Sequence, residues 1–193
     1  MKSLLLAFCL VVAPLTAQAG PILSLNPTFQ SVPLGTQASV DVVVSDLEQD
    51  QTIGAFDFTL FFDPSIVSLN SSSFGSALGG ATINDVVPGV GSVNAASVSL
   101  EDPATLLLLQ SAGPFTLFRA VFDTLSVGTT PLTFALSPFV FADGEGVDIT
   151  DVTASPGSIT VTGIQGVPDN VDSLVSLCMG LLVVLLGTWK LRT

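Results

Sequence analysis

Residues 55–64, AFDFTLFFDP, decide the fold of this chain. One set of alternate side chains is apolar (Phe56, Phe58, Leu60 and Phe62), and the intervening set is mostly polar (Asp57, Thr59, Phe61 and Asp63). Alternation with a period of two, carried by aromatic residues, is typical of a β-strand with one buried face. Because Phe61 adds a ring to the polar set, we expect the outward face to be partly covered, as in a central strand of a sandwich.

The same pattern recurs through the middle of the chain. Further strand candidates are residues 39–46, 92–100, 115–125, 131–136, 139–143 and 157–163. Turn signals separate them at 32–35, 63–64, 128–131, 143–146 and 156–157. Many short strands punctuated by turns predict an all-β domain, either a sandwich or a barrel. Residues 71–80 are expected to form a loop, and residues 103–110 (PATLLLLQ) fit either a helical turn or an apolar strand.

The N-terminus has the features of an export signal. Lys2 precedes an apolar run over 4–12, and Ala17 and Ala19 form a small-x-small cleavage site before Gly20. A first core strand with a basic start is the alternative. The order of these features predicts a signal peptide over the first nineteen residues, so the chain is expected to be exported.

The C-terminus has the features of a membrane anchor. Residues 174–189 hold no charge, and at about 1.5 Å per helical residue they span about 24 Å, which is a short transmembrane helix. Trp189 suits the membrane interface, and Lys190 and Arg192 suit the cytoplasmic side. A buried core helix is the alternative, although such a helix usually keeps a polar face. One domain, residues 20–165, remains between the two ends.

The charge of that domain is strongly one-sided. The chain has a formal net charge of −12, and Arg119 is the only cation between residues 20 and 165. Such a surface repels nucleic-acid phosphates, so no nucleic-acid partner is expected. It could attract basic partners or divalent cations, and the solubility of an exported domain is the competing explanation for the charge. Arg119 is expected to pair with a carboxylate such as Asp57 or Asp63.

The available side chains argue against catalysis. The chain has no histidine and no tyrosine, and its only tryptophan is Trp189. Both cysteines, Cys9 and Cys178, lie in the apolar ends, so the domain has no thiol nucleophile and no disulfide. A carboxylate-based glycosidase stays open as an outside hypothesis, and it would need two acids facing each other across a cleft, about 5–10 Å apart. We expect a protein that is not an enzyme.

Calcium is the ligand chemistry that the carboxylates suit best. The stronger candidate set is Asp143, Glu145, Asp148 and Asp151, in a loop punctuated by glycine. The weaker set is Asp46, Glu48 and Asp50. Hard cations prefer several carboxylate oxygens on flexible backbone. Solvated loop acids without any metal are the competing explanation.

Three stretches resemble, in order, the pattern of the cohesin family: residues 32–46, 53–71 and 117–136. The matching positions are Gly35, Gly54, Phe58, Asp63, Pro64, Val67, Phe122, Gly128 and Leu132. The resemblance implies a jelly-roll β-sandwich of about nine strands. It also implies a binding role, since cohesins bind dockerin modules in polysaccharide-degrading assemblies. Glycine and Asp-Pro have local conformational roles, so we interpret these positions as determinants of the fold.

Residues 166–193 resemble the PEP-CTERM class of sorting signals, in the variant that begins VPDSG. Val167, Pro168 and Asp169 match that motif, whereas Asn170 and Val171 replace the usual Ser-Gly. The resemblance implies recognition by an exosortase, a membrane protease-transpeptidase. The protein would first be held at the inner membrane and then moved to the cell surface or the extracellular matrix. A plain membrane anchor is the alternative.

The sequence therefore predicts an exported, non-catalytic binding or adhesive module of the cell surface or matrix. Its partner would be a protein, such as a dockerin-like module, or an exopolysaccharide. The alternative is a scaffold that binds dockerin-bearing carbohydrate-active enzymes.

Overall fold

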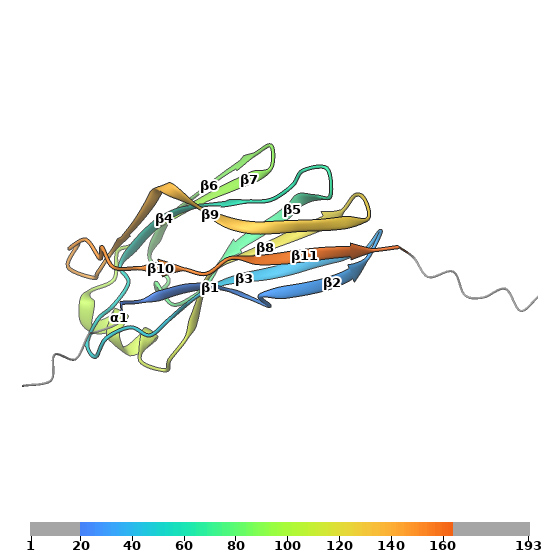
Figure 1. Ribbon diagram of the computed structural model, residues 1–193. Coiled ribbons are helices and arrows are strands. Elements are labelled where there is room, and N and C mark those ends of the chain that lie inside the picture. Colours follow the sequence, from blue (N-terminus) through green and yellow to red (C-terminus); the bar gives the residue numbers. More distant parts are fainter. Residues whose placement is uncertain (1–19, 164–193) are drawn as a thin grey trace, which may run out of the picture. The chain divides into compact units, whose positions relative to one another are not determined.

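The computed structural model describes residues 20–163, which contain eleven strands arranged in two sheets and one helix (Figure 1). The elements are β1 (Ile22–Asn26), β2 (Phe29–Pro33), β3 (Gln37–Ser45), β4 (Ala55–Phe61), β5 (Val67–Phe74), β6 (Thr82–Gly89), β7 (Ser92–Ser99), α1 (Pro103–Gln110), β8 (Phe115–Thr124), β9 (Gly128–Ala142), β10 (Thr153–Ala154) and β11 (Gly157–Thr162). Within these residues no helix is long and apolar enough to span a bilayer. The predicted signal peptide and the predicted transmembrane helix lie outside the described part of the chain.

The strands form a sandwich of two sheets. One sheet has five strands in the order β10-β1-β3-β8-β5, and the other has six in the order β2-β11-β9-β4-β7-β6. Neighbouring strands are antiparallel except for the pairs β1–β10 and β2–β11, which are parallel. The predicted all-β sandwich is confirmed. The strand count is higher than about nine because the N-terminal and C-terminal segments each divide between the two sheets.

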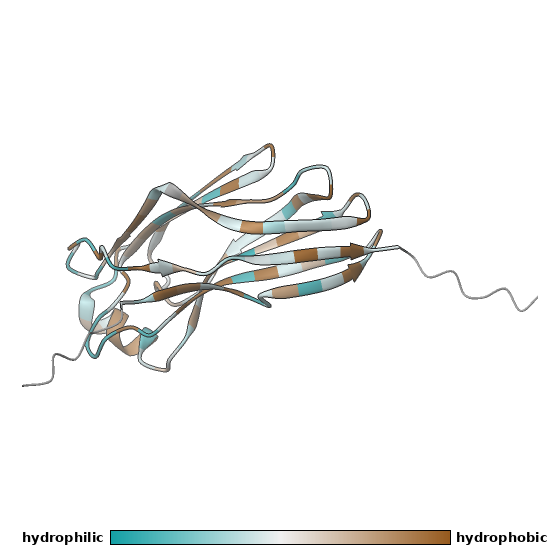
Figure 2. Ribbon diagram, in the orientation of Figure 1, coloured by the Kyte–Doolittle hydropathy of each residue, from teal (hydrophilic) through white to brown (hydrophobic). Residues whose placement is uncertain are grey.

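The core lies between the sheets and is rich in phenylalanine. The side chains of Phe56, Phe58, Leu60 and Phe62 are all buried, as the alternation in residues 55–64 predicts. Phe58 makes an edge-to-face contact with Phe118 of the opposite sheet, with ring centroids 6.1 Å apart. Figure 2 shows apolar and polar residues alternating along several strands. Burial of one face per strand therefore holds the two layers together.

Several strands differ from the sequence prediction. Residues 71–74 continue β5 instead of starting a loop, because β8 pairs with them through Phe74. Residues 131–136 and 139–142 are parts of one long strand, β9, which ends one residue before Asp143. The edge strand β6 has little alternation in its sequence because most of its side chains are exposed on both faces. Strand β2 is not among the predicted strands, because the turn signal at 32–35 includes its last two residues.

The surroundings of Gly54 explain why glycine occupies this position, which is one of those that match the cohesin pattern. Its N–H donates to the carbonyl of Ala142 and its carbonyl accepts from Ser99 N–H, each at 2.8 Å. A Cβ on Gly54 would lie only 2.3 Å from the carbonyl oxygen of Asp143. The close approach of three strands requires glycine here, so this position is a determinant of the fold.

The ambiguous segment 103–110 is a helix, α1. Thr105 N–H donates to Asp102 Oδ1 at 3.0 Å, and the Thr105 hydroxyl donates to Asp102 Oδ2 at 2.8 Å. These bonds cap the first turn and hold the pKa of Asp102 below its ordinary value. Pro103 then occupies the first turn, where its missing N–H costs little.

Gln110 anchors the other end of α1. Its Oε1 accepts from Ile53 N–H at 2.8 Å, and its Nε2 donates to the carbonyls of Ile53 at 2.8 Å and Ala77 at 3.2 Å. Gln110 is 6% exposed, so these bonds satisfy backbone groups that water does not reach. One glutamine therefore fixes the helix to the chain that leads into β4.

We expect Gln110→Ala to lower the free energy of unfolding by about 2–4 kcal/mol, because it leaves buried backbone groups of Ile53 and Ala77 unpaired. Urea denaturation of the full chain measures this. The matched control, Gln49→Ala, removes an exposed amide and should change stability by less than about 0.5 kcal/mol. Equal effects of the two substitutions would contradict the anchoring role.

Candidate interaction face

The outward surface of β6, β7, β4 and β9 carries a group of exposed apolar side chains, which we call the apolar face. Strand register places its residues in rows. One row is Ile83, Val98, Ala55 and Ala142, and the next is Asp85, Ala96, Asp57 and Val140. The large members are well exposed: Ile83 62%, Val87 55%, Val140 49%, Val98 47% and Phe61 46%. Side chains from four adjacent strands thus form one continuous surface.

The outward residues Ala55, Asp57 and Thr59 of β4 are half-buried, as expected for a partly covered central strand, whereas Phe61 is exposed. β4 is an interior strand, paired with β7 on one side and β9 on the other. Within residues 20–163 no second layer lies over Phe61, which is 46% exposed. A monomeric domain rarely leaves a contiguous apolar surface open, and such surfaces often mark interaction sites.

A polar centre interrupts the apolar face. The Asn94 side-chain amide donates to Asp57 Oδ1 at 2.7 Å, to Thr59 Oγ1 at 3.1 Å and to the Phe58 carbonyl at 3.1 Å. These bonds hold the Asp57 carboxylate in place on the sheet. Asp85 lies in the same row, separated from Asp57 by Ala96. The face therefore combines apolar area with two acceptors and offers no cation.

The opposite surface, on the five-stranded sheet, is polar. Arg119 pairs with Asp41 through Nε–Oδ1 at 2.5 Å and Nη2–Oδ2 at 2.8 Å, which corrects the expectation of Asp57 or Asp63 as its partner. The two residues lie directly opposite each other in the register of β8 and β3. The bonds to Asp41 and the attraction of its charge raise the pKa of Arg119. Arg119 is thus paired on the face that lies away from the apolar one.

Asp123 extends this polar surface. Its carboxylate accepts from the side-chain amides of Asn70 at 2.7 Å and Gln37 at 2.9 Å. Both bonds favour the ionised form, so the pKa of Asp123 lies below its ordinary value. Its acceptors are occupied by neighbouring strands, which gives this carboxylate a structural role.

Asp63 acts in the turn that the sequence predicts. Ser65 donates to its Oδ1 through the hydroxyl at 2.6 Å and through the N–H at 2.9 Å. The Asp63 carbonyl accepts from Ile66 N–H and Val67 N–H, each at 3.1 Å. The bonds from Ser65 lower the pKa of Asp63. The Asp-Pro position is therefore explained by local hydrogen bonding.

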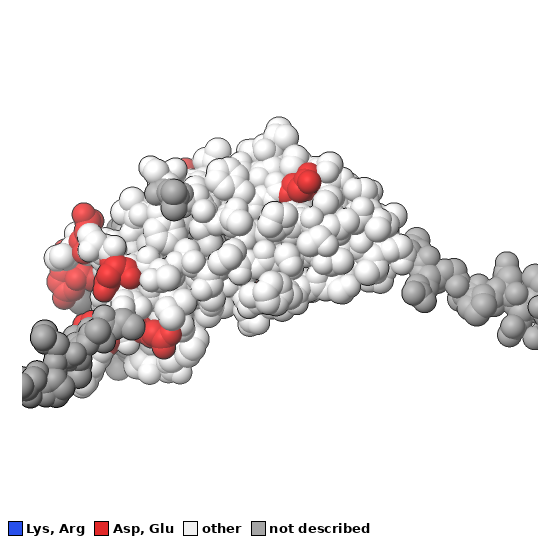
Figure 3. All heavy atoms as spheres, viewed as in Figure 1, with Lys and Arg blue, Asp and Glu red and all other residues white. Residues whose placement is uncertain are grey.

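The loop between β9 and β10 contains the stronger set of predicted calcium ligands. Asp143 Oδ1 already accepts from Val147 N–H at 2.8 Å and Glu145 N–H at 3.0 Å, and Asp151 lies beside Gly20. Figure 3 shows acidic side chains gathered at the end of the domain where this loop lies. Within residues 20–163 no three acidic groups are arranged so that they could hold a metal ion. The calcium hypothesis, including the weaker set Asp46, Glu48 and Asp50, therefore gains no support.

The remaining predicted site residues cannot be placed. The sorting motif Val167, Pro168 and Asp169 and the cleavage-site residues Ala17 and Ala19 lie outside the described residues. The apolar face is not predicted from the sequence. Its signal was present in the valines that occupy outward positions of strands, since Val98 and Val140 each lie one residue from a buried neighbour.

Comparison with protein-family models and with curated proteins gives no match. Solved cohesins do match. The seventh ScaB type I cohesin from Pseudobacteroides cellulosolvens is 15% identical, with a TM-score of 0.61 over 77% of this chain and 96% of that one. A non-cellulosomal cohesin from Archaeoglobus fulgidus is 15% identical, with a TM-score of 0.55 over 77% and 94% of the two chains. The sixth cohesin of scaffoldin B from Acetivibrio cellulolyticus, solved in complex with a Cel5 dockerin, is 15% identical, with a TM-score of 0.58 over 74% and 99%.

These similarities define the class of fold. Residues 20–163 adopt a cohesin-like β-sandwich, as the resemblance of residues 32–46, 53–71 and 117–136 implied. At these levels of identity the likeness establishes the fold alone.

We expect Ser65→Ala to raise the pKa of Asp63 toward its ordinary value, because the substitution removes the hydroxyl donor. The folded-state pKa lies below the unfolded value, so the stabilising contribution is present at neutral pH and is lost as pH falls through the folded pKa. NMR titration of the Asp63 carboxyl measures the shift. Ser65→Ala should also lower the urea midpoint at pH 7, and the deficit should disappear in acid. Ser71→Ala, an exposed serine of β5, is the control.

Proposed function

We propose that residues 20–163 are a non-catalytic protein-binding module that uses the apolar face on β6, β7, β4 and β9. The observation that carries this proposal is the group of exposed apolar side chains on four neighbouring strands, arranged around a polar centre at Asp57 and Asn94. The cohesin-like fold supports it, because similar folds have been solved in complex with dockerins.

The chemistry of the face indicates what its partner must supply. Burial of apolar area contributes roughly 25 cal/mol per Å², so an apolar surface on the partner provides the driving force. Asp57 and Asp85 need hydrogen-bond donors or cations when they lose water, because a buried, unpaired carboxylate is costly. The partner is therefore a protein surface that places basic or donor groups opposite Asp57 and Asp85 and apolar side chains around them. A dockerin-like module on a secreted enzyme is the specific candidate.

An adhesive role toward exopolysaccharide is the second candidate. Sugar rings usually stack on tyrosine or tryptophan, and residues 20–163 contain neither. The exposed members of the apolar face are aliphatic apart from Phe61. This composition favours a protein partner over a polysaccharide.

We further propose that the chain is exported and then sorted through its C-terminal segment. The motif at 167–169, the uncharged run 174–189 and the terminal Lys190 and Arg192 support this proposal. In this view an exosortase-like enzyme processes the protein at the inner membrane. The binding module would then reach the cell surface or the extracellular matrix.

To test the binding face, we would capture partners from the secreted fraction on the tagged full chain and identify them by mass spectrometry. Ile83→Lys and Val98→Lys should each weaken binding of the captured protein by about tenfold or more, because each replaces an exposed apolar side chain of the face with a charge. Leu125→Lys is the matched control, since Leu125 is 52% exposed and lies outside the four strands. Equal binding by all three variants would contradict the proposal.

To test sorting, Pro168→Ala and Asp169→Ala should leave the unprocessed chain in the membrane fraction, because the proposed recognition motif is lost. Cell fractionation and the apparent mass measure this. The double substitution Asn170→Ser and Val171→Gly restores the VPDSG pattern and should increase processing. Release of the Pro168 and Asp169 variants at the normal rate would show that the motif is not read.

A further inference from the structure

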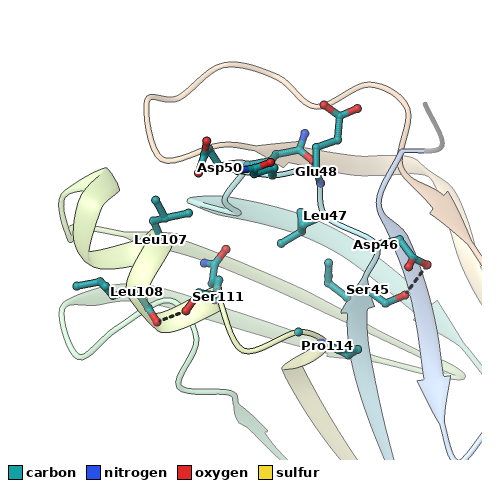
Figure 4. Close-up of a pocket in the computed structure, with 14 residues that line it drawn as sticks. Ser45, Asp46, Leu47, Glu48, Asp50, Leu107, Leu108, Ser111 and Pro114 are labelled. Carbon is teal, nitrogen blue, oxygen red and sulfur yellow. Dashed lines mark hydrogen bonds between the residues drawn. The ribbon is translucent and has the colours of Figure 1, made fainter. Parts of the chain in front are cut away.

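A second candidate binding site lies at the α1 end of the domain. A groove of about 640 Å³ runs between α1 and the loop that joins β3 to β4, and Figure 4 shows both walls. This volume is within the usual range of ligand sites, about 300–1,000 Å³. The site is separate from the apolar face, since none of its lining residues belongs to β6, β7, β4 or β9.

The walls of the groove are apolar. Leu47 comes from the loop, and Leu107 and Leu108 come from α1. Leu108 is 78% exposed, whereas the neighbouring Leu106 is buried. The helix needs Leu106 and Gln110 to pack against the domain, so packing of the domain does not explain the leucines on its other side.

Both walls are fixed by hydrogen bonds. Glu48 N–H donates to Gln51 Oε1 at 3.2 Å, and Gln51 N–H donates to the Glu48 carbonyl at 3.1 Å, which closes the loop. On the other side, Gln110 anchors α1 to Ile53, near the end of the same loop. A ligand would therefore meet a preformed groove and would lose little free energy to reorganisation of the protein.

The rim of the groove is acidic. Asp46, Glu48 and Asp50 all line it, and no cation does. The only ion pair among residues 20–163 joins Arg119 to Asp41, so no described cation neutralises the three carboxylates. Their charge repels anionic lipid headgroups and nucleic acid. Because all three acids come from one loop, no carboxylate faces another across the groove, as a glycosidase would require.

We propose that this groove binds a peptide segment of another protein in which an apolar side chain lies next to lysine or arginine. The apolar side chain inserts between Leu47 and Leu107. The flanking cations meet the carboxylates on the loop. The apolar walls and the acidic rim are complementary to such a segment. The same carboxylates would repel an anionic ligand.

A short synthetic peptide in which leucine and lysine alternate serves as the probe. Fluorescence anisotropy with the full chain in non-ionic detergent, with detergent alone as the blank, should show saturable binding that weakens with added salt. The triple variant Asp46→Asn, Glu48→Gln, Asp50→Asn should bind about tenfold more weakly. Leu107→Ser with Leu108→Ser should cause a similar loss, although it changes no charge. A peptide that alternates leucine and glutamate should not bind.

The matched control is Glu145→Gln, Asp148→Asn, Asp151→Asn, which removes the same charge from the loop between β9 and β10. This variant should bind the Leu-Lys peptide within about twofold of the original chain. An equal loss of peptide affinity in the two triple variants would show that binding results from general electrostatic attraction to a chain of net charge −12. That result would overturn the proposal. Competition by dodecyltrimethylammonium as strong as that of the peptide would overturn it in favour of a site for small cationic amphiphiles.

Discussion

Contact between phenylalanine rings of the two sheets is the constraint on which this domain depends. Phe56 and Phe58 of β4 meet Phe74 and Phe118 of the opposite sheet, with ring centroids 6.2 and 6.1 Å apart. A third contact joins Phe62 to Phe122, with ring centroids 5.1 Å apart. The domain has no cysteine for a disulfide, so apolar burial between the layers supplies most of its stabilisation. Each strand must therefore direct one set of alternate residues inward, which leaves the other set available for recognition.

The two outward surfaces use this freedom differently. On the five-stranded sheet, Asp41 and Arg119 satisfy each other, and Asp123 is satisfied by amides of adjacent strands. On the six-stranded sheet, Ile83 and Val98 extend into solvent. The polar groups of the first surface thus satisfy one another, whereas the second surface exposes apolar side chains to solvent. This asymmetry is the reason for proposing the six-stranded sheet as the binding surface.

Strands and buried faces that depend on a local pattern of residues can be predicted from the sequence. Contacts that depend on which strands pair, and in which register, cannot. The alternation around Phe58 identified β4 and its buried face. The helix over 103–110 could not be distinguished from a strand because its anchor, Gln110, acts on Ile53, far away in the chain. The partner of Arg119 depends on the pairing of β3 with β8, which includes an irregularity that no local pattern signals. Exposure of Phe61 likewise depends on whether another layer covers β4.

The direction of the last strand has a consequence for how the domain is presented. β11 ends at the opposite end of the sandwich from α1 and the loops beside it (Figure 1). A tether that follows Thr162 therefore attaches to the domain far from the leucine-lined groove. The proposed peptide site and the point where the chain leaves the domain thus lie at opposite ends of the sandwich.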